Sequence, residues 1–155
     1  MTAPPGPRAA DDPHDLRRFV DAQAQCYPQA LAELNAGCKR SHWMWFVFPQ
    51  LAGLGNSPTA HRFAIKNLAE ARAYLAHPIL GARLRECAQA MLRHEGCRAL
   101  DVLGTPDDLK LRSCATLFAC VSAPGSVFER LLDAFYGGER DERTLQLLGG
   151  VPGEA

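Results

Sequence analysis

The residues best suited to chemistry lie in one short run of the chain. Residues 43–48 hold four aromatic side chains, including both tryptophans of the protein, and Lys39, Arg40 and His42 come directly before them. An indole ring can stack on a flat ligand, a cation can bind phosphate or carboxylate, and a histidine can accept or donate a proton. The segment therefore predicts either the wall of a ligand site or the aromatic centre of a small core.

Helical spacing would divide these side chains between two faces. Residues 41–47 can form a short helix capped by Ser41, in which His42, Trp45 and Phe46 share one face by i, i+3, i+4 spacing. The other aromatic and apolar side chains of the segment would then lie on the opposite face. Because both faces cannot be exposed to water, we expect the segment to be wedged between other helices. A buried brace with solvated cations remains the alternative.

A second candidate is the charged segment that opens at Asp107. Asp107, Asp108, Lys110 and Arg112 lead directly into the most apolar stretch of the chain. Carboxylates are stabilised at a helix N-terminus, and Asp108 and Arg112 have the i, i+4 spacing of an ion pair. Lys110 and Arg112 point in different directions, so at least one must approach packed neighbours. A buried cation needs either a protein carboxylate or a bound anion, and both remain open.

Two hypotheses about function follow. In the first, the two segments converge on one cleft that binds a small anionic or nucleotide-like molecule, with His42 or Asp107 as a candidate catalytic residue if the protein is an enzyme. In the second, the protein is a non-catalytic interaction or structural module, whose charged segments lie apart or pair only with each other. The ligand-binding hypothesis assigns the site to Lys39, Arg40, His42, Trp43, Trp45, Gln50, Lys110 and Arg112.

Composition excludes several other classes of function. The formal net charge is zero, so the basic excess of a nucleic-acid-binding protein is absent, and no membrane partner is expected. No apolar run approaches the roughly 20 residues of a membrane span. The histidines and six cysteines show no metal-ligand spacing and no Cys-x-x-Cys pair, so we expect no metal, no cofactor and a reduced, cytoplasmic protein. The oligomeric state cannot be predicted.

Apolar periodicity predicts an all-α fold, a compact, multi-helical single domain over residues 14–148. Residues 1–13 and 149–155 are predicted to be a disordered N-terminal tail and a C-terminal tail. No segment shows the sustained alternation of a strand. The predicted helices cover residues 16–23, 28–37, 41–47, 57–66, 67–75, 78–95, 105–121, 126–136 and 141–148.

Two proline signals are specific within this pattern. Pro28 predicts a new helix start, since proline is tolerated in the first turn and breaks a helix interior. Thr105, followed by Pro106 and by Asp108 three residues on, predicts a capping box. The helix after it, through residue 121, is apolar on nearly all sides and should lie in the middle of the fold.

The run KRSHWMWFVFPQLAGLG, from Lys39 to Gly55, resembles the signature of a bacterial family of uncharacterised helical proteins, the domain-of-unknown-function family 1810. Further matches are EARAYLAHP at 70–78, PDDLKLRS at 106–113 and TLFA at 116–119, with Cys114 as one departure. The resemblance covers residues 16–148. It implies a multi-helical domain of this size and supplies no reaction.

Some members of that family carry the label calpastatin. Inhibitors of that type are long, disordered and repetitive, whereas this chain is short and has the apolar periodicity of a packed core. The label therefore does not describe this sequence.

Overall fold

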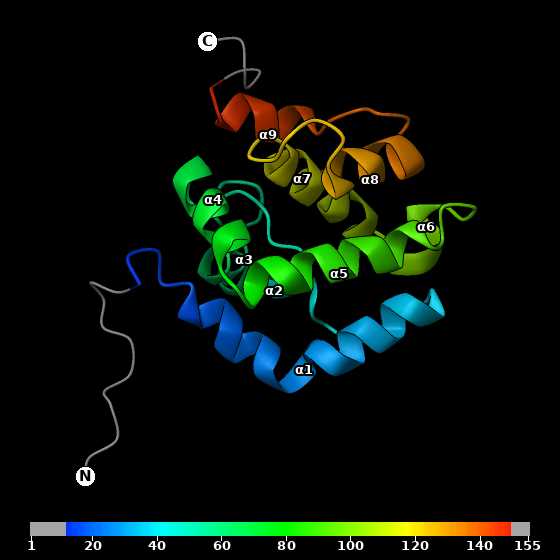
Figure 1. Ribbon diagram of the computed structural model, residues 1–155, viewed down its shortest axis with the longest axis horizontal. Coiled ribbons are helices and arrows are strands. Elements are labelled where there is room, and N and C mark those ends of the chain that lie inside the picture. The colour runs from blue at the N-terminus through cyan, green and yellow to red at the C-terminus, as the bar shows by residue number, and fades with distance from the viewer. Residues whose placement is uncertain (1–11, 150–155) are drawn as a thin grey trace.

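The computed structural model describes residues 12–149, which form nine helices joined by short loops (Figure 1). The predicted all-α class is confirmed. The predicted tails lie outside these residues, apart from 12, 13 and 149, and stay predictions. The helices are α1 (Arg17–Ala36), α2 (Met44–Val47), α3 (Pro58–Arg62), α4 (Leu68–Ala76), α5 (Leu80–Leu92), α6 (Ala99–Leu103), α7 (Asp107–Ala119), α8 (Val127–Tyr136) and α9 (Glu142–Leu147).

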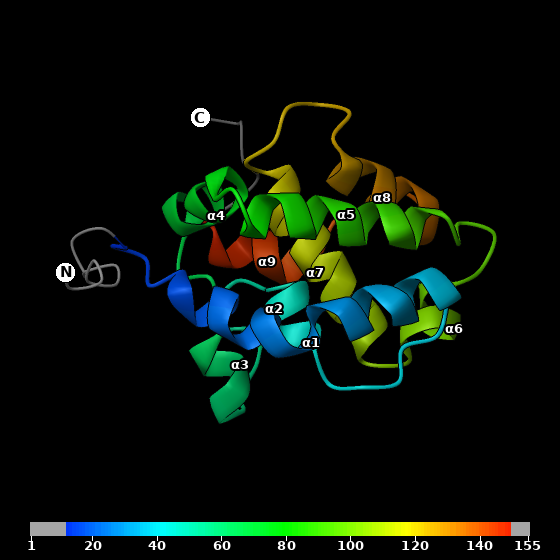
Figure 2. The same cartoon turned by 60° about the horizontal axis from the view of Figure 1, so that its bottom comes forward.

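Helix α7 lies at the centre of this arrangement, as its apolar sequence predicts. It packs against α4, α6, α8 and α9, and Figure 2 shows it between α5 and α8 on one side and α1 and α2 on the other. From Leu111 to Ala119 only Arg112 is not buried. A helix with almost no free perimeter must be covered on every side, which is why the shorter helices surround it.

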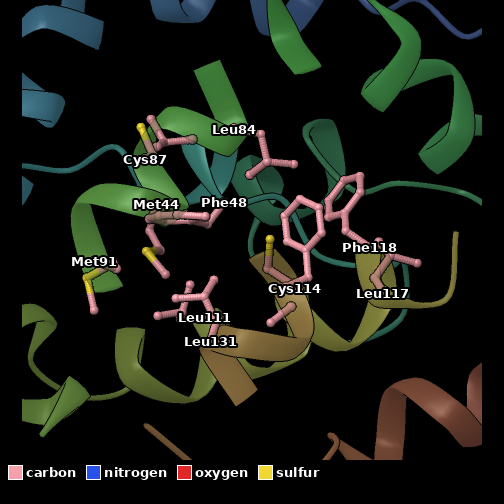
Figure 3. Close-up of a cluster of buried hydrophobic side chains, with 14 of the residues drawn as sticks. Met44, Phe48, Leu84, Cys87, Met91, Leu111, Cys114, Leu117, Phe118 and Leu131 are labelled. Carbon is pink, nitrogen blue, oxygen red and sulfur yellow. The ribbon is translucent and has the colours of Figure 1, made fainter. Parts of the chain in front are cut away.

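The main core forms where α2, α5, α7 and α8 meet (Figure 3). Met44, Leu84, Met91, Phe118 and Leu131 come from these four helices, and each is at most 1% exposed. Burying one such side chain contributes about 1.5–3 kcal/mol to folding. The packing of α2 into this core fixes the segment that carries both tryptophans.

The predicted helix start at Pro28 is wrong. Helix α1 runs without interruption for 20 residues with Pro28 inside it, and Figure 1 shows a bend near its middle. Proline removes one helical hydrogen bond and crowds the carbonyl four residues earlier, which bends a helix. Buried residues on both sides of the proline, Phe19 and Leu34, keep both halves of α1 packed on the core. Gly37 ends the helix with φ of 74°, as predicted.

Four predicted helix starts, at residues 57, 67, 126 and 141, are confirmed, and the structure shows a capping side chain at each. The side chains of Ser57, Asn67, Ser126 and Asp141 each accept a hydrogen bond from the backbone N–H three residues further on. These local signals hold because a cap needs only its own turn of chain to form.

Two local predictions fail where the backbone finds another partner, and one short helix was missed. The Thr105 capping box does not form, because the Asp108 N–H donates to the Gly104 carbonyl at 2.9 Å. The short α6 was not predicted. Helix α3 ends at residue 62 rather than 66, because the chain turns so that the Ile65 N–H donates to the Gln50 carbonyl at 2.8 Å. This contact belongs to a single parallel bridge between Leu51 and Ile65.

No helix in the stretch 12–149 is long and apolar enough to cross a bilayer.

The burial of α7 predicts a large contrast between two leucines of the same helix. Leu117 is fully buried and Leu109 is 54% exposed. We expect Leu117→Ala to lower the free energy of unfolding by about 2–5 kcal/mol, because it opens a cavity in the core. Leu109→Ala, the matched control, should change it by no more than about 0.5 kcal/mol. Urea denaturation followed by circular dichroism measures both, and equal losses would contradict a central α7.

Candidate functional site

A buried carboxylate, that of Glu33 in α1, holds the segment that precedes the tryptophans. One oxygen accepts hydrogen bonds from the Arg40 N–H at 2.7 Å, the Ser41 N–H at 3.0 Å and the Trp43 indole N–H at 2.9 Å. The other accepts from the Ser41 hydroxyl at 2.6 Å and the Gln29 amide at 3.0 Å. Ser41 is therefore not the helix cap that its position predicts, and α2 begins only at residue 44.

These donors outweigh the cost of burying the Glu33 charge. Burial alone would raise the pKa of the Glu33 carboxyl, but the hydrogen bonds from Ser41, the Arg40 N–H and Trp43 lower it from its ordinary value of 4.5 to about 2. The carboxylate thus stays ionised at all physiological pH values. It acts as a fixed anchor for the loop at 40–43.

The two charged segments predicted to converge do meet at Asp107. Its carboxylate accepts the Lys39 ammonium at 2.9 Å on one oxygen and the Lys110 ammonium at 3.4 Å on the other. Each ammonium also lies 5.2 Å from the centre of a tryptophan ring, Lys39 over Trp43 and Lys110 over Trp45. Both distances are within the range of cation–π attraction. The two stretches are thereby joined, although about 70 residues separate them in the sequence.

The charges of this cluster do not cancel. Two ammonium groups share one carboxylate, which leaves one positive charge from Lys39, Lys110 and Asp107 together. The Lys39 side chain is only 9% exposed, whereas that of Lys110 is 27% exposed. Lys110 is therefore the ammonium that can still reach a molecule from solution.

Two adjoining hollows lie beside Lys110. A narrow one, with about 20 Å³ of free space, lies between α2, the loop at 50–55 and α3. An open groove of about 400 Å³ runs between that loop and the first turn of α7. Trp45, Gln50 and Lys110 border both. The narrow hollow has room for little more than one water molecule, whereas the groove is large enough for a small ligand.

Small residues shape the wall between these hollows. A Cβ atom on Gly55 would lie 2.5 Å from the Cβ of Ala60, so only glycine fits there. Gly53 has φ of 101°, a conformation that side chains disfavour. His61 also lines the narrow hollow, and sequence reasoning gave it no role. The position of His61 depends on the turn that brings Ile65 next to Leu51, and no local sequence motif predicts that turn.

Several of the predicted ligand-binding residues lie elsewhere. Trp43 is 1% exposed and packs in the core, and Lys39 forms an ion pair with Asp107. His42 and Arg40 are exposed, and the His42 ring lies 6.4 Å from that of Trp45, outside the residues that line the two hollows. Of the eight residues predicted to bind a ligand, Trp45, Gln50 and Lys110 border the groove.

Arg112 lies away from the groove altogether. Its guanidinium donates to the carbonyl of Glu139 at 3.1 Å and that of Arg140 at 3.0 Å. The ion pair predicted between Asp108 and Arg112 does not form, because these carbonyls and the Glu139 carboxylate occupy the guanidinium. One oxygen of Asp108 is buried and has no hydrogen-bond partner.

Within residues 12–149, no three or more His, Cys, Asp or Glu side chains are grouped so that they could hold a metal ion. The groove is lined by the Lys110 ammonium, the Gln50 amide and the Trp45 indole, with the polar side chains of Asn56, Ser57 and Ser113 also bordering it.

The nine-helix fold and this signature segment define a class of small all-helical proteins. The chain belongs to the family described as "Protein of unknown function (DUF1810)", which matches residues 13–148. The chain is similar to a solved structure, that of the conserved hypothetical protein Rv1873 from Mycobacterium tuberculosis, a crystal structure at 1.38 Å. That protein is 51% identical, with a TM-score of 0.87, over 90% of this chain and 100% of its own. No curated protein matches the chain.

The hydrogen bonds of Glu33 predict a pH-dependent contribution to stability. Because its pKa is lower in the folded protein, the ionised group stabilises the fold above about pH 4.5, and this stabilisation is lost as pH falls toward 2. We expect Glu33→Gln to lower the free energy of unfolding by about 2–3 kcal/mol at pH 7. The difference from wild type should shrink steadily below pH 4.5 in urea denaturation.

Glu142→Gln is the matched control for this experiment, since Glu142 is exposed in the first turn of α9. It should leave the pH dependence of unfolding close to that of wild type. A Glu33→Gln deficit that is constant between pH 2 and 7 would contradict the role of the ionised carboxylate.

Proposed function

We propose that the groove beside Trp45 binds a small anionic ligand that carries a flat, nucleotide-like group. The observation that supports this most is the position of Lys110, whose ammonium lies over the Trp45 ring, borders both hollows and shares the Asp107 carboxylate with Lys39. The surplus positive charge favours an anion, and the partly exposed indole offers a stacking surface.

The groove offers matching contacts along its length. An anionic group would approach the Lys110 ammonium and the Gln50 amide, which both line the groove together with Trp45. The flat group would lie along Trp45 and the apolar side chains of Leu109 and Pro106. Leu109 is 54% exposed, and a ligand there would remove its apolar surface from water.

The two candidate catalytic residues differ in how they could serve this site. The Asp107 carboxylate contacts two ammonium groups, so its role is to hold them in place. His42 is exposed at the edge of the Trp45 ring and could reach a bound ligand. Of the two, His42 is therefore the candidate for proton transfer at this site.

A thermal-shift screen against nucleotides, sugar phosphates and carboxylates tests the proposal. We expect at least one nucleotide to raise the melting temperature of the wild-type protein in proportion to its concentration. Lys110→Met keeps the apolar stem but removes the charge, so it should weaken the affinity for that compound at least about tenfold, which is about 1.4 kcal/mol. Isothermal titration calorimetry measures this change.

Two variants make the result specific. Lys66→Met removes an exposed lysine that lines neither hollow and should bind as wild type does. His42→Ala should weaken binding less than Lys110→Met, because His42 lies outside the groove lining. A stabilising compound whose affinity is unchanged in Lys110→Met would remove this site from the proposal.

One observation favours the alternative, a non-catalytic interaction or structural module. Lys39, Lys110 and Asp107 pair with one another, as that hypothesis predicts, and Trp43 is sealed in the core. Under this alternative the cluster braces α2 against α7, and no compound in the screen stabilises the wild-type protein. Lys110→Met would then lower the melting temperature without changing the affinity for any small molecule.

We also propose that the protein works in a reducing, cytoplasmic setting. All six cysteines are unpaired, including the exposed Cys38 and Cys97. Exposed free thiols are uncommon in oxidising compartments, where they tend to form disulfides.

A further inference from the structure

A second hollow lies away from the groove beside Trp45. It has a volume of about 510 Å³ and is bounded by α4, α5, the start of α8 and the loop after α7. Figure 2 shows that loop rising beside α4, α5 and α8, away from α2 and α3. The two sites share no lining residue. Its volume is within the usual range of small-molecule sites.

The polar side chains that line this hollow are cationic or neutral. Arg72 comes from α4, and Arg85 and Gln89 come from one face of α5 by i, i+4 spacing. Ser122 and Ser126 flank them from the loop and the cap of α8. None of the residues that line it is acidic, so two guanidinium charges face a space without a carboxylate.

The carboxylates on the same three helices are engaged elsewhere. Glu70 of α4 is buried in an ion pair, Glu86 of α5 accepts a tyrosine hydroxyl, and Glu129 of α8 pairs with an arginine. Asp133 of α8 lines a different hollow. The partners of the first three are Arg18, Tyr27 and Arg140. The positive charge at Arg72 and Arg85 is thus not neutralised by its own helices.

The floor of the hollow is apolar. Leu75 and Phe128 are 8% and 2% exposed, and Val121 and Val127 lie beside them. One guanidinium nitrogen of Arg85 donates to the Leu75 carbonyl at 3.4 Å, which holds the head of this side chain at the end of α4. The remaining donors of Arg85 are available to a ligand, because a guanidinium has five N–H groups.

We propose that this hollow is a second ligand site, for a phosphate monoester that carries an apolar group. The guanidinium groups of Arg72 and Arg85 bind the phosphate, for which their planar donor geometry suits them. The apolar group lies on Leu75, Val127 and Phe128. Neither contact depends on the groove beside Trp45, so this site stands or falls separately from the proposed function.

Phenyl phosphate is the probe, with inorganic phosphate and phenol as its two halves. In isothermal titration calorimetry at pH 7.5, we expect phenyl phosphate to bind at least tenfold more tightly than either half. Arg72→Gln and Arg85→Gln should each weaken it at least tenfold, and Arg85→Lys should restore part of the loss, because it keeps the charge without the planar fork. The affinity should fall below pH 6, where the monoester loses one of its two charges.

Two control variants separate the possible outcomes. Arg143→Gln changes an exposed arginine of α9 outside the hollow and should bind as wild type does. Because phenyl phosphate also matches the ligand proposed for the groove beside Trp45, each titration is repeated in the Lys110→Met background, where the binding that depends on Arg72 and Arg85 should persist. Circular dichroism establishes that each variant is folded.

Three results would overturn the proposal. Phenyl phosphate could fail to bind at millimolar concentration, inorganic phosphate could bind equally well, or binding could be lost in Lys110→Met but kept in Arg72→Gln and Arg85→Gln. The last result would place the probe in the groove beside Trp45.

Discussion

The arrangement of both tryptophans depends on one buried charge, the carboxylate of Glu33. A carboxylate at 7% exposure is costly unless every oxygen is hydrogen-bonded, and five donors from residues 29, 40, 41 and 43 meet that need. These bonds fix the loop at 40–43 against α1. They orient the Trp43 ring toward the core, where it is buried. Trp45, two residues later, is partly exposed.

The cluster at Asp107 continues that division between an inner and an outer half. Lys39 and Trp43 form the inner half, where the ammonium and the ring are both almost sealed from water. Lys110 and Trp45 repeat the same pair at the surface, beside a groove. The same lysine–tryptophan pair therefore occurs on both sides of Asp107. The pair of Lys39 and Trp43 is part of the packed core, whereas the pair of Lys110 and Trp45 is accessible to solvent.

Much of the fold could be predicted because its signals are local. The apolar periodicity of α5 and α7 and the helix starts at Ser57 and Asn67 each depend on one turn or one face of a helix. The predictions at Pro28 and Thr105 were wrong because contacts outside the local pattern decided the structure there. Packing of both halves of α1 overrides a strong helix breaker, and the Gly104 carbonyl takes the donor that the Thr105 cap would need.

The sequence by itself determined an all-helical chain and the family to which it belongs, and it picked out two charged segments without deciding between a ligand site and a structural cluster. Only the tertiary structure decided which of those charges remain available. Lys39 pairs with Asp107, Arg112 donates to the carbonyls at 139 and 140, and the Trp43 ring is buried in the core. Trp45, Gln50 and Lys110, by contrast, border the groove. The physical reason is that a buried charge pairs with a group on whichever distant segment packs against it. Residue type and local spacing do not show which segment that will be.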